Sequence, residues 1–332
     1  MPPSHLELSI ALSDNERTRP VLEGRVVPQG ITLVPTMVHP SEMFWRQLRF
    51  AEFDVSEMSM SSLLIATSRG DTRWVAIPVF TMRKFFHTSI IVRTDSGIAK
   101  PADLRGKRIG VPEYQQTWAI WARGILQHGF GVHAREIEWF MERNPDKSHG
   151  GATGFAAPAG VRVNQIPPET NIGAMLLSGE LDGAIHYLVD KNLVDRSRVD
   201  ISAATRYLFP DPAAEGRRYY AKTGLFPINH TVVVRRSLLE RHPWIALNLY
   251  SAFVAAKEEI AACGQSYLSW YFETGLLDDA AKRTLAQNDP LAYGFKAARP
   301  VLETIAQYVH EQGLSARKVE LKEIFAPSTL DV

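Results

Sequence analysis

The order of strand-like and helical segments constrains the fold of this 332-residue chain more than any other feature. Residues Gly24–Pro35 are predicted to form a strand, Ser41–Arg49 have helical spacing of apolar side chains, and Phe53–Met58 are strand-like again. A strand–helix–strand unit requires parallel strands with helices packed on the faces of the sheet. Together with a first strand predicted over Leu6–Leu12, this order predicts an α/β fold.

A second α/β unit is predicted to start where the chain turns at Asp95–Gly97. Arg108–Val111 are predicted to form a strand and Thr117–His128 a helix, whereas Asn144–Gly160 are predicted to be a long polar loop. Thr231–Arg235 give a further strand before a long amphipathic helix. We therefore expect two lobes, each a mixed β-sheet flanked by helices, with a cleft between them: residues 1–95 and 205–332 form lobe one, and 96–204 form lobe two.

Charge and apolar content exclude several classes of partner. Thirty-seven basic and 36 acidic side chains leave a net charge of +1, which gives no overall field to attract nucleic acid or anionic lipid. No apolar run reaches the ~20 residues that cross a bilayer, and the N-terminus MPPSHLELSIALSDNER lacks a basic leader. A cytoplasmic location is therefore expected, with a homo-oligomer, by default a dimer, as the assembly.

A single cysteine, Cys263, rules out an intramolecular disulfide and a thiolate metal cluster. Because free cysteine usually behaves as a small buried apolar side chain, Cys263 is expected in the core. Trp118, Trp121, Trp139 and Trp244 are expected there too. The chain also lacks HExxH, P-loop and GxGxxG patterns, so neither a metal nor a nucleotide cofactor is predicted.

Two segments resemble the second lobe of type 2 periplasmic-binding proteins. Gly97-Ile98 through Asp103-Leu104-Arg105-Gly106-Lys107 to Pro112 is similar to the start of that lobe, and Leu177–Ala184 is similar to the return toward the hinge. The resemblance implies a type 2 periplasmic-binding-protein-like fold with the ligand cleft between its lobes.

A more specific resemblance extends over nearly the whole chain, to the 4,5-dihydroxyphthalate decarboxylase family. It is carried by the segments Arg17-Thr18-Arg19-Pro20, Glu52–Ser59, Ala76–Phe80 with Arg83 and His87, Gly110–Gln115, Thr223–His230, His242-Pro243-Trp244 and Glu323–Pro327. Two departures are Phe86, where an arginine is expected, and residues 182–190, which lack an Ala-Arg-x-Pro-like stretch. The resemblance implies a carboxy-lyase that converts 4,5-dihydroxyphthalate to 3,4-dihydroxybenzoate and CO2 without a cofactor.

This chemistry needs a proton donor, an acceptor for the phenol proton and donors for carboxylate. Histidine has an unperturbed pKa near 6.5, so His87 and His230 are the candidates for acid–base catalysis. A structural hydrogen bond is the alternative for each. His186 ends a strand predicted over Gly183–Leu188 and is a candidate for substrate binding. Glu57 and Glu113 are candidate acceptors of the catechol protons, with ion pairing as the alternative.

The remaining candidates would bind the substrate. Arginine matches a carboxylate with two parallel donors, which favours Arg83 and one of Arg17 and Arg19, the alternative being salt bridges. Ser59 and Ser61 follow a strand and can bind an anion or cap a helix. Tyr114 and Thr117 are expected on the second-lobe side of the cleft.

Two functions remain open for this fold, because the same architecture supports both. The first is the lyase, with a small aromatic carboxylate as its partner. The alternative is a solute-binding protein that delivers a small carboxylate to an ABC-type transporter.

Overall fold

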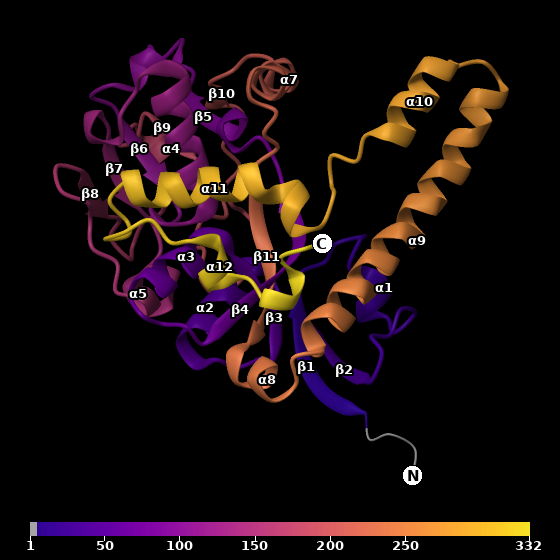
Figure 1. The fold of residues 1–332 in the computed structure, drawn as a ribbon. Helices are drawn as coiled ribbons and strands as arrows, with labels where there is room; N and C mark the ends of the chain where they lie inside the picture. The colour runs from indigo at the N-terminus through magenta and orange to yellow at the C-terminus, as the bar shows by residue number, and fades with distance from the viewer. Residues whose placement is uncertain (1–4) are drawn as a thin grey trace.

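The computed structural model describes residues 5–332; residues 1–4, the start of the segment compared with a secretory leader, lie outside the described residues. Two β-sheets organise the molecule (Figure 1). The first has the order β2-β1-β3-β11-β4, with bounds Ile31–Met37, Leu6–Leu12, Val55–Ser59, Ile228–Arg235 and Trp74–Arg83. The second has the order β10-β5-β9-β6-β7-β8, with bounds Thr205–Tyr207, Ile90–Arg93, Gly183–Ile185, Arg108–Val111, Glu138–Met141 and Arg162–Gln165.

Both sheets are mixed. In the first, β1 pairs in parallel with β2 and β3, as the strand–helix–strand order requires, while β11 runs antiparallel to β3 and β4. In the second, β6 pairs in parallel with β7 and β9, and β5 is antiparallel to β9 and β10. Strand β11, from the second half of the chain, thus lies between β3 and β4, which come from its first quarter. β10 forms one edge of the second sheet and β5 lies next to it, although the sequence predicts both strands in lobe one.

Helices flank the two sheets. The α-helices are α1 (Arg19–Leu22), α2 (Pro40–Phe50), α3 (Met60–Ser68), α4 (Thr117–Phe130), α5 (His149–Thr153), α6 (Ile172–Ser178), α7 (Pro212–Thr223), α8 (Arg236–Arg241), α9 (Ile245–Glu273), α10 (Asp279–Gln287), α11 (Phe295–Glu311) and α12 (Leu321–Ile324). Short 3₁₀ helices are η1 (Phe86–Ser89), η2 (Pro101–Leu104), η3 (Ala134–Glu136), η4 (Pro145–Lys147) and η5 (Pro327–Thr329). No helix within residues 5–332 has the length and apolarity needed to cross a membrane.

Three sequence expectations are wrong. The predicted loop Asn144–Gly160 contains α5, which begins at Ser148 because that side chain accepts a hydrogen bond from the Gly151 N–H. Cys263 is exposed, because the outer half of α9 runs away from the body and leaves no apolar surface to cover it. Trp244 is 39% exposed because it is the N-cap residue of α9 and lies at the surface where this helix begins.

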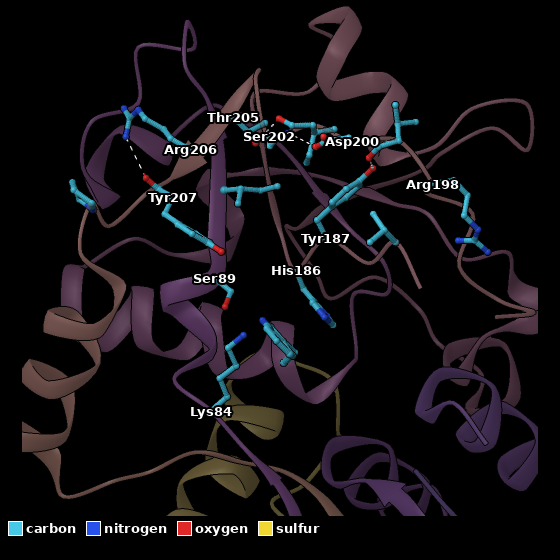
Figure 2. Close-up of a pocket in the computed structure, with 16 residues that line it drawn as sticks. Lys84, Ser89, His186, Tyr187, Arg198, Asp200, Ser202, Thr205, Arg206 and Tyr207 are labelled. Carbon is cyan, nitrogen blue, oxygen red and sulfur yellow. Dashed lines mark hydrogen bonds between the residues drawn. The ribbon is translucent and has the colours of Figure 1, made fainter. Parts of the chain in front are cut away.

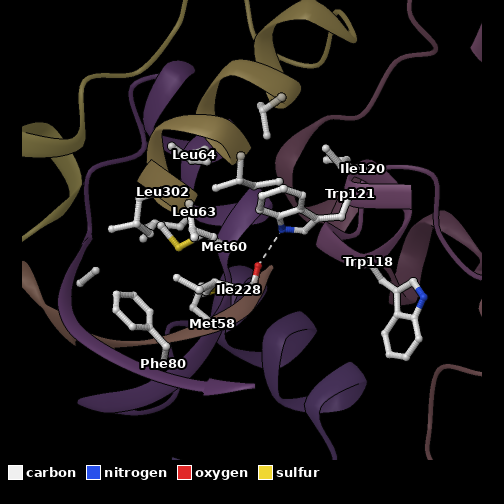
Figure 3. Close-up of a cluster of buried hydrophobic side chains, with 14 of the residues drawn as sticks. Met58, Met60, Leu63, Leu64, Phe80, Trp118, Ile120, Trp121, Ile228 and Leu302 are labelled. Carbon is white, nitrogen blue, oxygen red and sulfur yellow. Dashed lines mark hydrogen bonds between the residues drawn. The ribbon is translucent and has the colours of Figure 1, made fainter. Parts of the chain in front are cut away.

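One apolar core spans both sheets. Met58 and Leu63 from the first lobe and Trp121 and Ile120 from α4 belong to the same buried cluster, shown in Figure 3. The indole N–H of Trp121 donates to the carbonyl oxygen of Ile228 on β11 at 2.8 Å. The two lobes therefore share a dry interface beside the cleft.

Helix α11 reinforces this interface by packing against both α3 and α4. The contact with α4 depends on Gly124, where the ring of Tyr308 lies so close that an added Cβ would be 2.7 Å from the ring carbon Cγ. Only a residue without a side chain allows this approach of the two helices.

A buried ion-pair network of the second lobe is bonded to the first lobe beside the inner cavity. Arg143 follows β7 and contacts the carboxylates of Asp195 (2.6 Å) and Glu113 (3.0 Å). It also donates to the Ser41 hydroxyl of α2 at 2.5 Å. Burial opposes the ionisation of Asp195, but Arg143 outweighs it and lowers the pKa of the carboxyl to about 2.

Replacing Gly124 with alanine should destabilise the protein by about 1–3 kcal/mol, because the methyl group overpacks the contact with Tyr308. Gly129→Ala, in the same helix, is the matched control. A Cβ added at Gly129 would have its nearest neighbour, the Ile125 side chain, at 3.9 Å, so alanine should stabilise the protein by roughly 0.5–1 kcal/mol. Urea unfolding measures both values. Equal effects of the two substitutions would contradict the close packing of α4 on α11.

Asp195→Asn should lower the free energy of unfolding by about 2 kcal/mol near neutral pH, since a pKa below the ordinary 3.8 means that the ionised carboxyl stabilises the folded state. This contribution is complete above about pH 4 and is lost as the pH falls toward 2. Urea titrations should therefore show the same difference from the parent at pH 7 and pH 5 and a smaller one at pH 3. Asp331→Asn, in a surface ion pair with Lys296, is the control and should change little.

Candidate active site

Two cavities lie between the lobes and share a wall formed by Trp118 and His186. The inner cavity, of about 290 Å³, is lined by His230, Phe44 and Ser59 from the first lobe and by Thr117, Gln116 and Arg143 from the second. The outer cavity, of about 1040 Å³, contains Lys84, Tyr187 and Arg206 (Figure 2). The inner volume is near the lower end of the ~300–1,000 Å³ typical of small-molecule sites.

His230 faces the inner cavity because strand β11 is irregular at this position. The register of β11 against β4 shifts on both sides of His230, and such bulges redirect a side chain from its regular position. Its Nδ1 lies 3.3 Å from the Glu57 carboxylate, and its Nε2 lies 2.9 Å from the side-chain nitrogen of Asn229. These partners favour the tautomer that carries its proton on Nδ1.

Glu57 supports His230 from the first sheet and is fully buried. Burial alone would raise the pKa of this carboxyl, but hydrogen bonds from His230, Ser13 and Thr81 lower it below its ordinary value. The ionised carboxylate accepts from the Ser13 hydroxyl at 2.6 Å and from the Thr81 hydroxyl at 2.7 Å. Glu57 therefore orients His230 and does not reach the cavity itself.

Hydroxyl groups from both lobes meet in the cavity wall. The Ser59 hydroxyl lies 2.9 Å from that of Thr117, and the Ser61 N–H donates to Thr117 at the same distance. The Ser61 hydroxyl donates to the carbonyl oxygen of Gln115 at 2.7 Å, so it is already used. Ser59 and Thr117 are thus the two predicted hydroxyls that line the cavity.

His186 forms the wall between the two cavities in a strained backbone conformation. Its φ of 62° is left-handed, which is costly for a residue other than glycine and occurs preferentially at functional sites. The ring stacks on Trp118 with centroids 3.6 Å apart, and Nδ1 lies 2.8 Å from the Gln116 side-chain nitrogen. Burial lowers the pKa of His186 to about 3. It is therefore neutral at pH 7 and cannot supply a proton as an imidazolium.

His87, the other histidine expected to act in acid–base catalysis, lies away from the cavities. His87 is fully buried in η1, where its Nε2 is 2.9 Å from the Glu215 carboxylate and its ring contacts Phe209 and Tyr219. The structure does not bring His87 to the cleft, because η1 turns this ring toward α7.

The arginines expected to bind carboxylate also point elsewhere. Arg83 donates to the carbonyl oxygens of Phe226 and Ala292, each at 3.0 Å. Arg17 donates to the carbonyl oxygen of Thr81 at 2.6 Å, and Arg19 forms an exposed ion pair with Asp14. Main-chain carbonyls and a surface carboxylate therefore occupy these guanidinium groups.

Glu113 and Tyr114 are buried in the second lobe. The Glu113 carboxylate accepts from Arg143 and from the His149 and Gly150 N–H groups. Tyr114 packs under the guanidinium of Arg123, which is 3.7 Å from the ring centroid. Neither side chain is among those that line the two cavities.

Sequence reasoning missed several polar residues that line the cavities, among them Lys84 and Arg143. His149 lies in the segment predicted as a loop, and His39 precedes α2, so neither has a pattern that marks it. Asn229 lies within one family-like segment and Gln116 directly follows another, and that position is the only signal that pointed to them. Within residues 5–332, no three His, Cys, Asp or Glu side chains are arranged to hold a metal ion.

The arrangement can transfer protons inside a small enclosed space. A histidine held by a buried carboxylate faces one side of the inner cavity, and hydroxyl, amide and aromatic groups form the other walls. Such a site suits acid–base chemistry on a small aromatic molecule.

Comparisons with known proteins agree with this architecture. The family model described as "ABC transporter, phosphonate, periplasmic substrate-binding protein" matches residues 29–213, more than half of the chain. Among solved structures, the periplasmic aliphatic sulphonate binding protein SsuA from Escherichia coli has a TM-score of 0.56 at 13% identity, covering 98% of this chain and 99% of that one. The desulfurization enzyme DSZB has a TM-score of 0.53 at 15% identity, with 97% of both chains covered. These structures establish the two-lobed periplasmic-binding-protein fold.

Sequence relatives are more specific. A 4,5-dihydroxyphthalate decarboxylase from Comamonas testosteroni is 35% identical over 330 residues, which are 99% of this chain and 98% of that protein. A second, from Pseudomonas putida, is 39% identical over 180 residues, covering 54% of this chain and 70% of that protein. The chain, with its periplasmic-binding-protein fold, therefore belongs to the 4,5-dihydroxyphthalate decarboxylase family.

Proposed function

We propose that this protein is a carboxy-lyase that converts 4,5-dihydroxyphthalate to 3,4-dihydroxybenzoate and CO2 without a cofactor. The observation that carries the proposal is the Glu57–His230 pair at the wall of a small cavity lined by both lobes. Membership of the decarboxylase family over the full length of the chain supports the same reaction.

The reaction requires a proton at the ring carbon that bears the leaving carboxylate. As the proton of the para hydroxyl is withdrawn, an electron pair of its oxygen enters the ring. The ring carbon that bears the leaving carboxylate then takes a proton from the protonated Nε2 of His230. The carbon–carbon bond then breaks, its electrons restore the aromatic ring, and CO2 leaves. The oxygen regains a proton, so that one proton is consumed for each CO2 released.

The groups around His230 fit this cycle. Glu57 accepts the Nδ1 proton and fixes the ring, which leaves Nε2, contacted by the Asn229 amide, as the nitrogen that exchanges a proton with the substrate. Gln116 has a buried side-chain oxygen without a hydrogen-bond partner among the described residues, and it lines the same cavity. This oxygen is suited to accept a hydrogen bond from a substrate hydroxyl.

The alternative function is delivery of a small carboxylate to a transporter. The match to the substrate-binding family model over residues 29–213 favours it, and the fold neighbours include sulphonate-binding proteins. A solute-binding protein needs no buried acid–base pair, so the Glu57–His230 arrangement favours the lyase.

The direct test is incubation of the purified protein with 4,5-dihydroxyphthalate in the presence of a chelator and without added cofactor. Appearance of CO2 and 3,4-dihydroxybenzoate in equal amounts supports the lyase. Tight binding of the substrate without release of CO2 supports the transport function instead. Turnover that is lost on chelation and restored by one divalent metal contradicts the cofactor-free mechanism.

Replacing His230 with glutamine should lower kcat about 10²–10⁴-fold with little change in substrate affinity, because proton donation acts in the transition state. His87→Gln is the matched control: it removes the bond to Glu215 outside the cavities and should reduce stability while kcat stays within a few-fold. Single-turnover CO2 release and calorimetric affinity separate the two effects. A larger loss of kcat in His87→Gln would show that His87 is the donor.

We also propose that the protein works in the cytoplasm as a homodimer. The hairpin of α9 and α10 stands away from the body (Figure 1) and exposes Tyr267, Trp270 and Leu276 by 66%, 65% and 74%. Exposed apolar side chains in such a group favour contact between protein surfaces, and two-fold homo-oligomers are the commonest assemblies.

Sedimentation of the parent protein should therefore give twice the monomer mass of 37.2 kDa. The double substitution Trp270→Ser and Leu276→Ser should shift it toward the monomer, while the exposed polar pair Arg299→Ser and Glu303→Ser should not. A parent that sediments as a monomer at all concentrations would contradict the proposal.

A further inference from the structure

Lys84 lines the outer cavity, next to Trp118 of the wall that the two cavities share. It follows β4 directly, and its backbone N–H donates to the carbonyl oxygen of Pro227. Its ammonium lies 4.8 Å from the centre of the Trp118 ring, and the side chain lines the outer cavity. Figure 2 shows Lys84, Ser89 and His186 at the same end of this cavity.

The Lys84 ammonium has no carboxylate partner within residues 5–332. The side chain of Lys84 is exposed, but partial desolvation lowers the pKa of its ammonium, with no compensating charge contribution from an acidic group. Arg143, the arginine on the inner cavity, is already neutralised by Glu113 and Asp195. Arg198 and Arg206 of the outer cavity donate to main-chain carbonyls, so Lys84 is a cation next to the shared wall that is available for an anionic ligand.

Two buried polar atoms on residues that line the inner cavity have no hydrogen-bond partner among residues 5–332. They are the indole nitrogen of Trp118 and the side-chain oxygen of Gln116, on residues that are 5% and 8% exposed. Buried polar groups in folded proteins are almost always hydrogen-bonded, so a polar ligand in this cavity would supply what these two atoms lack. A cation, a donor and an acceptor together match a hydroxylated aromatic acid.

The two carboxylates of the proposed substrate have different electrostatic needs. The leaving carboxylate loses its charge as CO2 forms, so a cation on it would stabilise the ground state more than the transition state. The retained carboxylate stays charged throughout the reaction. A fixed cation can bind it without opposing the chemistry.

We propose that Lys84 binds the carboxylate that the reaction retains and thereby determines the specificity for aromatic dicarboxylates. This inference rests on the proposed function. It places the retained carboxylate toward the outer cavity and the leaving carboxylate toward His230. His186, in the wall that the two cavities share, is close enough to both Lys84 and His230 for their charges to affect it.

The test compares binding of 3,4-dihydroxybenzoate, which carries the retained carboxylate alone, with binding of 3,4-dihydroxybenzamide, its uncharged analogue. Calorimetry gives the affinity of the parent, Lys84→Met and Lys84→Arg for both ligands. The preference for the acid over the amide should fall about 10- to 100-fold in Lys84→Met, the loss expected for a charged hydrogen bond. Lys84→Arg should keep most of this preference, because the charge remains.

Lys222→Met, which removes an exposed lysine near the end of α7, is the control for a general change in charge and should leave the preference unchanged. Circular dichroism confirms the fold of each variant. An unchanged preference in Lys84→Met overturns the inference, as does an equal loss of affinity for acid and amide. Because these measurements need no turnover, a selective loss in a protein that releases no CO2 would contradict the lyase and still support the carboxylate contact.

Discussion

The buried interface between the lobes is the constraint on which the site depends. Trp121 of α4 inserts its indole into the core of the first lobe and donates to the main chain of β11, two residues before His230. The same helix begins at Thr117, which is bonded to Ser59 and Ser61. Groups from both lobes are therefore held by one dry core before any ligand arrives, and such preorganisation reduces the cost of orienting the reacting groups.

Charge is distributed unevenly around the cavities. Glu57 is buried against His230, and Arg143 is neutralised by Glu113 and Asp195, so the inner cavity contains few groups of uncompensated charge. A low-charge cavity that is partly shielded from solvent strengthens the interactions of the proton that moves there. Lys84 stands outside this balance, on the outer cavity.

The fold by itself does not decide between binding and catalysis, because architecture and function are only loosely coupled. The structural neighbours include binding proteins and a desulfurization enzyme at 13–15% identity. What suits this chain to a lyase is a histidine backed by a carboxylate at the wall of a cavity lined by both lobes. The rest of the architecture supplies a cleft that either function can use.

Local sequence determined the secondary structure and the family. The strands Leu6–Leu12 and Arg108–Val111 and the start of α4 at Thr117 follow from their own apolar periodicity, and long family-like segments identified the decarboxylase relatives. His230 was identified as a candidate in the same way, at the boundary of a predicted strand.

Tertiary structure alone decided which polar residues face the cleft. His87 and His230 look alike in sequence, but η1 directs one toward Glu215 and the bulge in β11 directs the other into the cavity. Arg83 is used by carbonyl groups of Phe226 and Ala292, whereas Lys84 next to it is left without a counterion. Periodicity reports which face of an element is apolar; the partner of a polar group depends on segments more than a hundred residues away, so only the folded chain determines it.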